Sequence, residues 1–154
     1  MSVLATIRPN DWEFPLFLHV LGALTLIGAL TLTVALLFSV WRGGSAAGVR
    51  LALRSLTFGV IPAWLVLRVS AEWIADKEGY ADLDEPPDWI GIGYLAGDAG
   101  FLLILISTLL AWLATRKVRA EGTPTGTVRA AALLISLLLL LNLVALWAMT
   151  TKPG

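Results

Sequence analysis

Four long apolar stretches, separated by short polar connections, make up most of the chain. A helix that crosses the ~30 Å hydrocarbon core of a bilayer needs roughly 20 apolar residues, and each stretch is long enough to do so. The pattern therefore predicts an all-α integral membrane protein, with four transmembrane helices arranged as a bundle of two hairpins. The predicted spans, which form a single transmembrane domain over residues 1–154, cover residues 14–40, 56–75, 90–114 and 130–149.

The connections between the spans differ in composition. Residues 43–54 are rich in Gly, Ala and Ser and are predicted to be a linker, and residues 76–88 are predicted to be an acidic loop that contains Pro86 and Pro87. Within the second span, Pro62 predicts a kink, because proline removes a backbone donor and clashes with the preceding turn. The loop after the third span is predicted to hold Arg116, Lys117, Arg119 and Arg129, with a Gly/Thr/Pro stretch over residues 122–127.

Charge is distributed unevenly among these connections. The first and third connections hold seven of the eleven Lys and Arg residues, whereas the acidic middle loop holds one. Because cytoplasmic loops of membrane proteins are enriched in Lys and Arg, this asymmetry predicts that both termini lie outside. The tryptophans near the predicted boundaries agree with this orientation: Trp12, Trp73, Trp89 and Trp147 fall at the outer ends, and Trp41 and Trp112 at the inner ends.

Composition supports the membrane assignment. The 154 residues are 58% hydrophobic and 14% charged, whereas a soluble domain carries roughly 25% charged residues. The mean hydropathy is +0.83. Because the formal net charge is zero, the sequence gives no reason to expect a nucleic-acid partner. The expected surroundings are the lipid bilayer of a bacterial-type plasma membrane, in which the chain is multi-pass.

Five polar side chains interrupt the apolar spans, and all four predicted helices contribute to them. Counting ~1.5 Å of rise per residue from the outer end of each span places them about 5–12 Å deep. Ionisable groups inside a membrane face the bundle interior and pair with one another. We therefore expect one buried cluster in the outer half of the bundle. Its members are His19, Arg68, Glu72, Asp98 and Asn142.

The spacing of the charged residues indicates how they pair. Arg68 and Glu72 are four residues apart, so they share one helix face and their side chains can meet. Asp98 can serve as a second acceptor for the Arg68 guanidinium, which has five donors to satisfy. Such a cluster either stabilises the bundle or lines an outward-facing cavity for a small ligand, and the sequence leaves both interpretations open.

Other motifs concern packing and chemistry. Gly93 and Gly97 form a GxxxG motif, which marks close helix packing in apolar helices. The chain has no Ser–His–acid constellation, HExxH motif or P-loop, so no catalytic residue and no metal site is assigned, and a non-catalytic role is favoured. There are no cysteines, which excludes disulfides and thiolate ligands. Further small residues that permit close contact lie in the first span at Gly22, Ala23, Gly28 and Ala29.

His19 stands early in the first span, in the string Leu18, His19, Val20, Leu21, Gly22. This string resembles the opening of several bacterial multi-span families: predicted integral membrane proteins of unknown function, copper-resistance membrane proteins and the haem-dependent protoporphyrinogen oxidase. The last resemblance implies that His19 is an axial ligand of haem b. The chain departs from these families because it has no second histidine, only two methionines and no lysine within a span. A bis-histidine haem would therefore require two chains, each supplying its His19.

These features lead to three hypotheses for the function. The first is a non-catalytic integral membrane protein, an accessory or assembly-forming subunit that acts as a homo-oligomer or within a membrane complex. The second is a haem- or quinone-associated redox protein that uses His19. The third is a small-solute transporter or channel built from several copies, because the inner half of one chain has almost no polar path.

Overall fold

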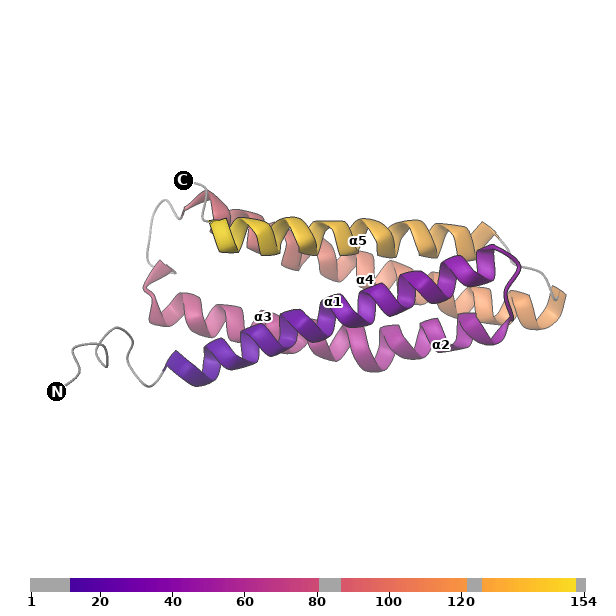
Figure 1. Cartoon of the computed structure of the whole chain (residues 1–154), viewed down its shortest axis with the longest axis horizontal. Helices are drawn as coiled ribbons and strands as arrows, with labels where there is room; N and C mark the ends of the chain where they lie inside the picture. The colour runs from indigo at the N-terminus through magenta and orange to yellow at the C-terminus, as the bar shows by residue number, and fades with distance from the viewer. Residues whose placement is uncertain (1–11, 81–86, 122–125, 152–154) are drawn as a thin grey trace.

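The structure is a computed structural model that describes residues 12–80, 87–121 and 126–151. Within these ranges the backbone is helical apart from short turns, and it contains no strand. The elements, shown in Figure 1, are α1 (Glu13–Trp41), α2 (Ala47–Ser55), the π-helical turn η3 (Leu56–Val60), α3 (Ile61–Lys77), α4 (Asp88–Glu121) and α5 (Gly126–Thr151).

Four helical segments are long and apolar enough to cross a membrane. They are Glu13–Trp41, Ala47–Lys77, Asp88–Val118 and Gly126–Thr151, and the second consists of α2, η3 and α3 in one continuous rod. The predicted all-α, four-helix membrane bundle is therefore confirmed, and the chain is a multi-pass membrane protein.

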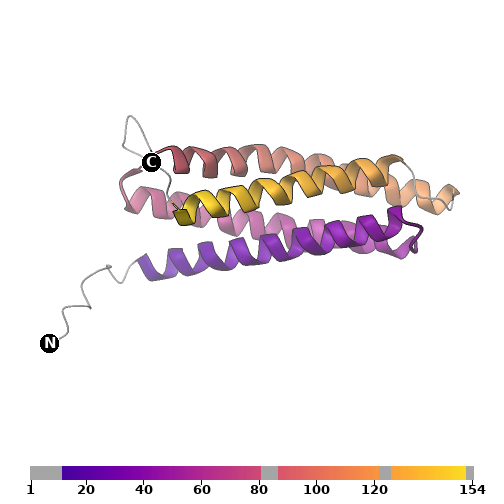
Figure 2. The same ribbon diagram turned by 45° about the horizontal axis from the view of Figure 1, so that its top comes forward.

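The helices run up and down, so that two ends of the bundle can be distinguished. The start of α1, the end of α3, the start of α4 and the end of α5 lie at one end, and the turn between α1 and α2 lies at the other (Figures 1 and 2). We call the first the outer end, because the charge asymmetry predicts that it is extracytoplasmic, and the second the basic end.

Two predicted connections are shorter in the structure than the sequence suggested. The predicted linker over residues 43–54 is wrong beyond its first few residues, because α2 begins at Ala47. Val49 and Ala52 are buried on one side of α2, and this apolar face outweighs the polar composition of the segment. Similarly, α4 continues to Glu121 and α5 begins at Gly126, so the basic residues predicted in the loop between them are helical. They are Arg116, Lys117 and Arg119 in α4 and Arg129 in α5.

Parts of the other predicted loops fall outside the described residues. These parts are residues 81–86 of the acidic loop and residues 122–125 of the Gly/Thr/Pro stretch.

The effect of Pro62 takes the form of a widened turn. The π-helical turn Leu56–Val60 directly precedes α3, in whose first turn Pro62 stands. A proline cannot donate to the carbonyl one turn earlier, and a local change to longer-range hydrogen bonds relieves both the missing donor and the ring clash.

The apolar core joins the helices unevenly. α1 packs on α2, α3 and α5, whereas α4 packs mainly on α5 and, toward the basic end, on α2. α3 and α4 meet at few positions in the outer half. We call this boundary the α3/α4 seam, and it holds Arg68, Glu72 and Asp98. The largest fully buried side chains include Leu26, Leu30, Leu37, Leu56, Ile104, Ile135 and Leu138.

Candidate functional site

An arginine and two carboxylates meet at the α3/α4 seam. Arg68 Nη1 lies 2.8 Å from Glu72 Oε1 within α3. Arg68 Nη2 lies 3.2 Å from Asp98 Oδ1 of α4. The first pair follows from the four-residue spacing, which stacks the two side chains on one helix face. The structure thus brings together three of the five predicted cluster residues, and we call Arg68, Glu72 and Asp98 the charged triad.

Tyr94 is a fourth participant that the sequence analysis missed. Its hydroxyl donates a hydrogen bond of 3.2 Å to Glu72 Oε2. The Arg68 guanidinium carbon lies 4.8 Å from the centre of the Tyr94 ring, as in a cation–π contact. Tyr94 precedes Asp98 by one helical turn, so the same four-residue rule that paired Arg68 with Glu72 would have placed it on this face.

Gly97 and Trp64 complete the connection between the two helices. A Cβ at Gly97 would lie 3.7 Å from the Arg68 stem, which is ordinary van der Waals contact, so the arginine packs along α4 at this position. Trp64 Nε1 donates a 3.1 Å hydrogen bond to the Gly97 carbonyl, and its ring stacks on Phe101 at 4.6 Å. Polar and aromatic contacts therefore hold α3 to α4 where aliphatic packing is sparse.

The triad is much more open than the sequence predicted. The side chain of Arg68 is 26% exposed, that of Glu72 is 51% exposed and that of Asp98 is 67% exposed. The prediction assumed that lipid would drive all the polar groups into the bundle interior. Instead the carboxylates lie along the seam at its surface, because the interior between the helices is filled by aliphatic side chains.

Asn142 and Gly93 make other contacts. Asn142 Nδ2 donates a 2.9 Å hydrogen bond to the Leu138 carbonyl of its own helix. No hydrogen bond links Asn142 to the triad within the described residues. Gly93 faces Met149 of α5, whereas Gly97 faces α3. The two glycines of the GxxxG motif thus face two different helices, and a Cβ at Gly93 would displace the flexible end of the Met149 side chain.

His19 also lies apart from the triad. Its Nδ1 is buried and has no hydrogen-bond partner among the described residues. The backbone of Leu67 in α3 lies beside the ring, and a side chain at Gly22 would come within 2.9 Å of the Leu67 nitrogen. α1 and α3 enclose Nδ1, so His19 could bind a haem iron only through its other ring nitrogen, Nε2.

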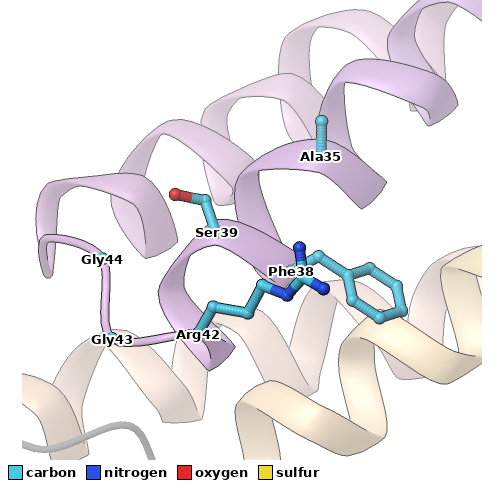
Figure 3. Close-up of a pocket in the computed structure, with 6 residues that line it drawn as sticks. All are labelled: Ala35, Phe38, Ser39, Arg42, Gly43 and Gly44. Carbon is cyan, nitrogen blue, oxygen red and sulfur yellow. The ribbon is translucent and has the colours of Figure 1, made fainter.

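Two hollows lie away from the triad. One, of about 540 Å³, is at the basic end of α1 and includes Ser39 and Arg42; Figure 3 shows that these two side chains point in different directions. Gly43 has a φ of 96°, and the Gly44 nitrogen donates to the Ser39 carbonyl, so these glycines form the C-terminal cap of α1. The hollow is the space beside this cap. The other, of about 650 Å³, is a shallow apolar groove between α1 and the rod of α2 and η3.

Aromatic residues mark the outer end. Phe14 of α1 meets Trp73 of α3 edge-on at 6.2 Å, and Tyr80 meets Trp89 at 5.7 Å. Burial, followed by the charge and hydrogen bond of Glu78, raises the pKa of the Tyr80 phenol above its ordinary value. Tyr80 therefore stays neutral at physiological pH, as expected of a side chain in an aromatic belt.

The described residues contain no group of three or more His, Asp or Glu side chains that could hold a metal ion. The candidate site is therefore the charged triad with Tyr94, and its chemistry is that of ion pairing and hydrogen bonding. Comparisons with protein-family models, with curated proteins and with solved structures find no match to this chain.

Proposed function

We propose that this protein is a non-catalytic subunit of a protein assembly in a plasma membrane, and that the α3/α4 seam is the surface through which it contacts another protein. One observation carries the proposal: Asp98 is 67% exposed on a helix face that a bilayer would cover. A carboxylate in the middle of a membrane helix costs about 2.5–3.5 kcal/mol when lipid surrounds it. A protein partner over the seam would remove that contact with lipid.

The depth of Asp98 supports this interpretation. Trp89, near the start of α4, marks the outer interface, and Asp98 follows it by nine residues, which is about 13 Å along the helix. Half of a ~30 Å hydrocarbon core is about 15 Å, so Asp98 lies near the bilayer centre. A long arginine can reach toward the headgroups from such a depth, but an aspartate is too short to do so.

The surroundings of the triad argue for a helical partner. Exposed aliphatic residues flank it on both helices: Val69 is 63% exposed on α3, and Leu102 is 61% exposed on α4. Charged groups at the centre with apolar residues around them form a surface that another transmembrane helix can cover. The occupant is either a second copy or another membrane protein.

The other roles considered for the triad receive less support. The contacts from Arg68 to Asp98 and from Tyr94 to Glu72 do join α3 to α4, so the triad also stabilises the bundle. They leave the exposure of Asp98 unexplained. A pore through one chain is opposed by the aliphatic core, in which Leu30 and Leu37 are fully buried.

In-membrane photocrosslinking tests the proposal. We would replace Leu102, beside the triad, with benzoylphenylalanine, and would make the same replacement at Phe58, which is 78% exposed on η3, as the control. We expect a discrete protein adduct from position 102 in native membranes, and lipid adducts alone from position 58. An adduct of twice the chain mass would identify a homo-oligomer. If position 102 gave lipid adducts alone, the proposal would be refuted.

A further inference from the structure

The charge balance of the triad indicates the chemistry of the partner. Arg68 contributes one positive charge, and Glu72 and Asp98 contribute two negative charges, so the site carries a net charge of −1. Both Glu72 oxygens are used, because Oε1 pairs with Arg68 and Oε2 accepts from Tyr94. Asp98 Oδ1 pairs with Arg68, whereas Oδ2 has no partner within the described residues. The uncompensated charge is therefore on Asp98.

A second copy of the chain would not neutralise this charge. Two seams placed face to face would bring the net charge to −2, and the Arg68 of each copy already serves its own two carboxylates. Apart from Arg68, the basic residues in the outer half of the described spans are His19 and Lys77. Lys77 is the last residue of α3, nine residues and about 13 Å beyond Arg68 along the helix, so it lies at the outer interface rather than at the depth of the triad. His19 lies beside Leu67 with Nδ1 buried, away from the seam. The missing positive charge must come from another molecule.

We propose that the seam binds a transmembrane helix of a different protein that carries a single Lys or Arg opposite Asp98 Oδ2. This inference rests on the proposed function and adds the identity of the partner group. The basic side chain would bring the net charge of the site to zero and would give Oδ2 a donor. The aliphatic residues around the triad, Val69 and Leu102, would pack against the apolar remainder of that helix.

The full-length protein in lipid vesicles provides the test, with synthetic transmembrane peptides as probes. One peptide is a leucine-rich helix with a single Lys about nine residues from its outer tryptophan anchor, at the depth of Asp98. A second has Leu in place of that Lys, and a third carries the Lys in its inner half. Energy transfer between the labelled protein and each labelled peptide reports association. We expect the first peptide to bind roughly tenfold more tightly than either of the other two.

Two variants make the test specific. Asp98→Asn should reduce the preference for the Lys peptide to about one. Asp88→Asn removes the same charge from the exposed start of the same helix, and it should leave the preference unchanged. The inner-half Lys peptide keeps the test valid even where Asp98→Asn fails to fold, because it alters only the probe.

The possible results separate this inference from the proposed function. Equal binding of the Lys and Leu peptides by the unaltered protein would overturn the inference, as would a preference that survives in a folded Asp98→Asn variant. A protein adduct from position 102 together with equal peptide binding would keep the seam as an assembly surface and exclude a basic partner. The absence of a protein adduct together with a strong Lys preference would refute the assembly role in native membranes. It would still support binding of a basic transmembrane helix at Asp98.

Discussion

Two glycines on α1, Gly22 and Gly28, illustrate what a single residue contributes in this bundle. They are six residues apart and therefore lie on different faces of the helix. Gly22 is buried, and a Cβ there would lie 2.9 Å from the backbone nitrogen of Leu67. A Cβ on Gly28 would meet nothing within 4 Å. Close approach of α1 to α3 therefore depends on Gly22, and Gly28 has no such role.

We predict that Gly22→Ala lowers the stability of the detergent-solubilised protein by about 1–3 kcal/mol, because backbone atoms of α3 would have to move away. Gly28→Ala is the matched control. It should leave stability unchanged or raise it by up to about 1 kcal/mol, since alanine is the better helix former. Thermal unfolding of the two variants measures the difference. Equal melting temperatures would contradict the close α1–α3 contact.

At this scale the sequence predicted part of the site. The pairing of Arg68 with Glu72 depends on helical spacing alone, so it could be foreseen. The contact of Arg68 with Asp98 was also expected, because the guanidinium has donors to spare. Spacing within a helix does not reveal how far a face is turned from its neighbours, and for this reason the exposure of Asp98 and the separate position of Asn142 were not predicted.

At the level of helices, the length of an apolar stretch predicts that a span exists, whereas packing against neighbouring helices determines where the helix begins and how it is distorted. The four spans were recognisable because uninterrupted apolar stretches of that length have few alternatives. The start of α2 was not predicted because Arg50 and Arg54 make the segment polar on average. Its apolar residues, Val49 and Ala52, are buried only because α1 packs beside them. Likewise, a proline indicates that a helix is disturbed, but whether a kink or a π-helical turn results depends on the neighbouring helices.

The hairpin of α1 and α2 contains an interhelical hydrogen bond that can be tested. Thr33 Oγ1 lies 2.9 Å from Ser55 Oγ, and both hydroxyls are within hydrogen-bond distance of the Ala29 carbonyl, at 2.7 and 3.2 Å. Thr33 is buried. We expect Thr33→Val and Ser55→Ala each to lower stability, with a coupling of about 0.6 kcal/mol in the double-mutant cycle.

Thr31→Val provides the control for this cycle. Thr31 is exposed on the same helix and hydrogen-bonds only to the carbonyl of Ile27, four residues earlier. Its substitution should change stability by less than about 0.5 kcal/mol. Additive effects of Thr33→Val and Ser55→Ala in unfolding experiments would show that the two hydroxyls do not act together.

For the whole molecule, the unequal packing of the helices matters most. α1 is held by three neighbours, and α4 is held mainly by α5 and by α2 near the basic end. The outer parts of α3 and α4 are therefore the least supported by aliphatic contacts, and the charged triad lies between them. A bundle that functions alone would be expected to cover this seam with its own side chains. The exposed seam therefore agrees with a subunit whose partner covers it.

Which leaflet contains the seam depends on the orientation of the chain, and single-cysteine labelling can determine it because the natural sequence has no cysteine. Glu78→Cys lies at the outer end and Ser45→Cys at the basic end, and both positions are exposed. Seven of the eleven Lys and Arg residues lie toward the basic end, in the turn between α1 and α2 or in the adjoining ends of α2, α4 and α5. We therefore expect a membrane-impermeant maleimide to label Glu78→Cys in intact cells, and to label Ser45→Cys only after permeabilisation.

The reverse labelling pattern would place Asp98 in the cytoplasmic half of the bilayer, and labelling of both positions in intact cells would indicate mixed orientation. The expected pattern has a direct consequence for the partner helix. Asp98 would lie about 13 Å below the extracytoplasmic interface, so the basic residue opposite it must lie at the same depth. A Lys or Arg nearer the cytoplasmic interface could not reach the seam.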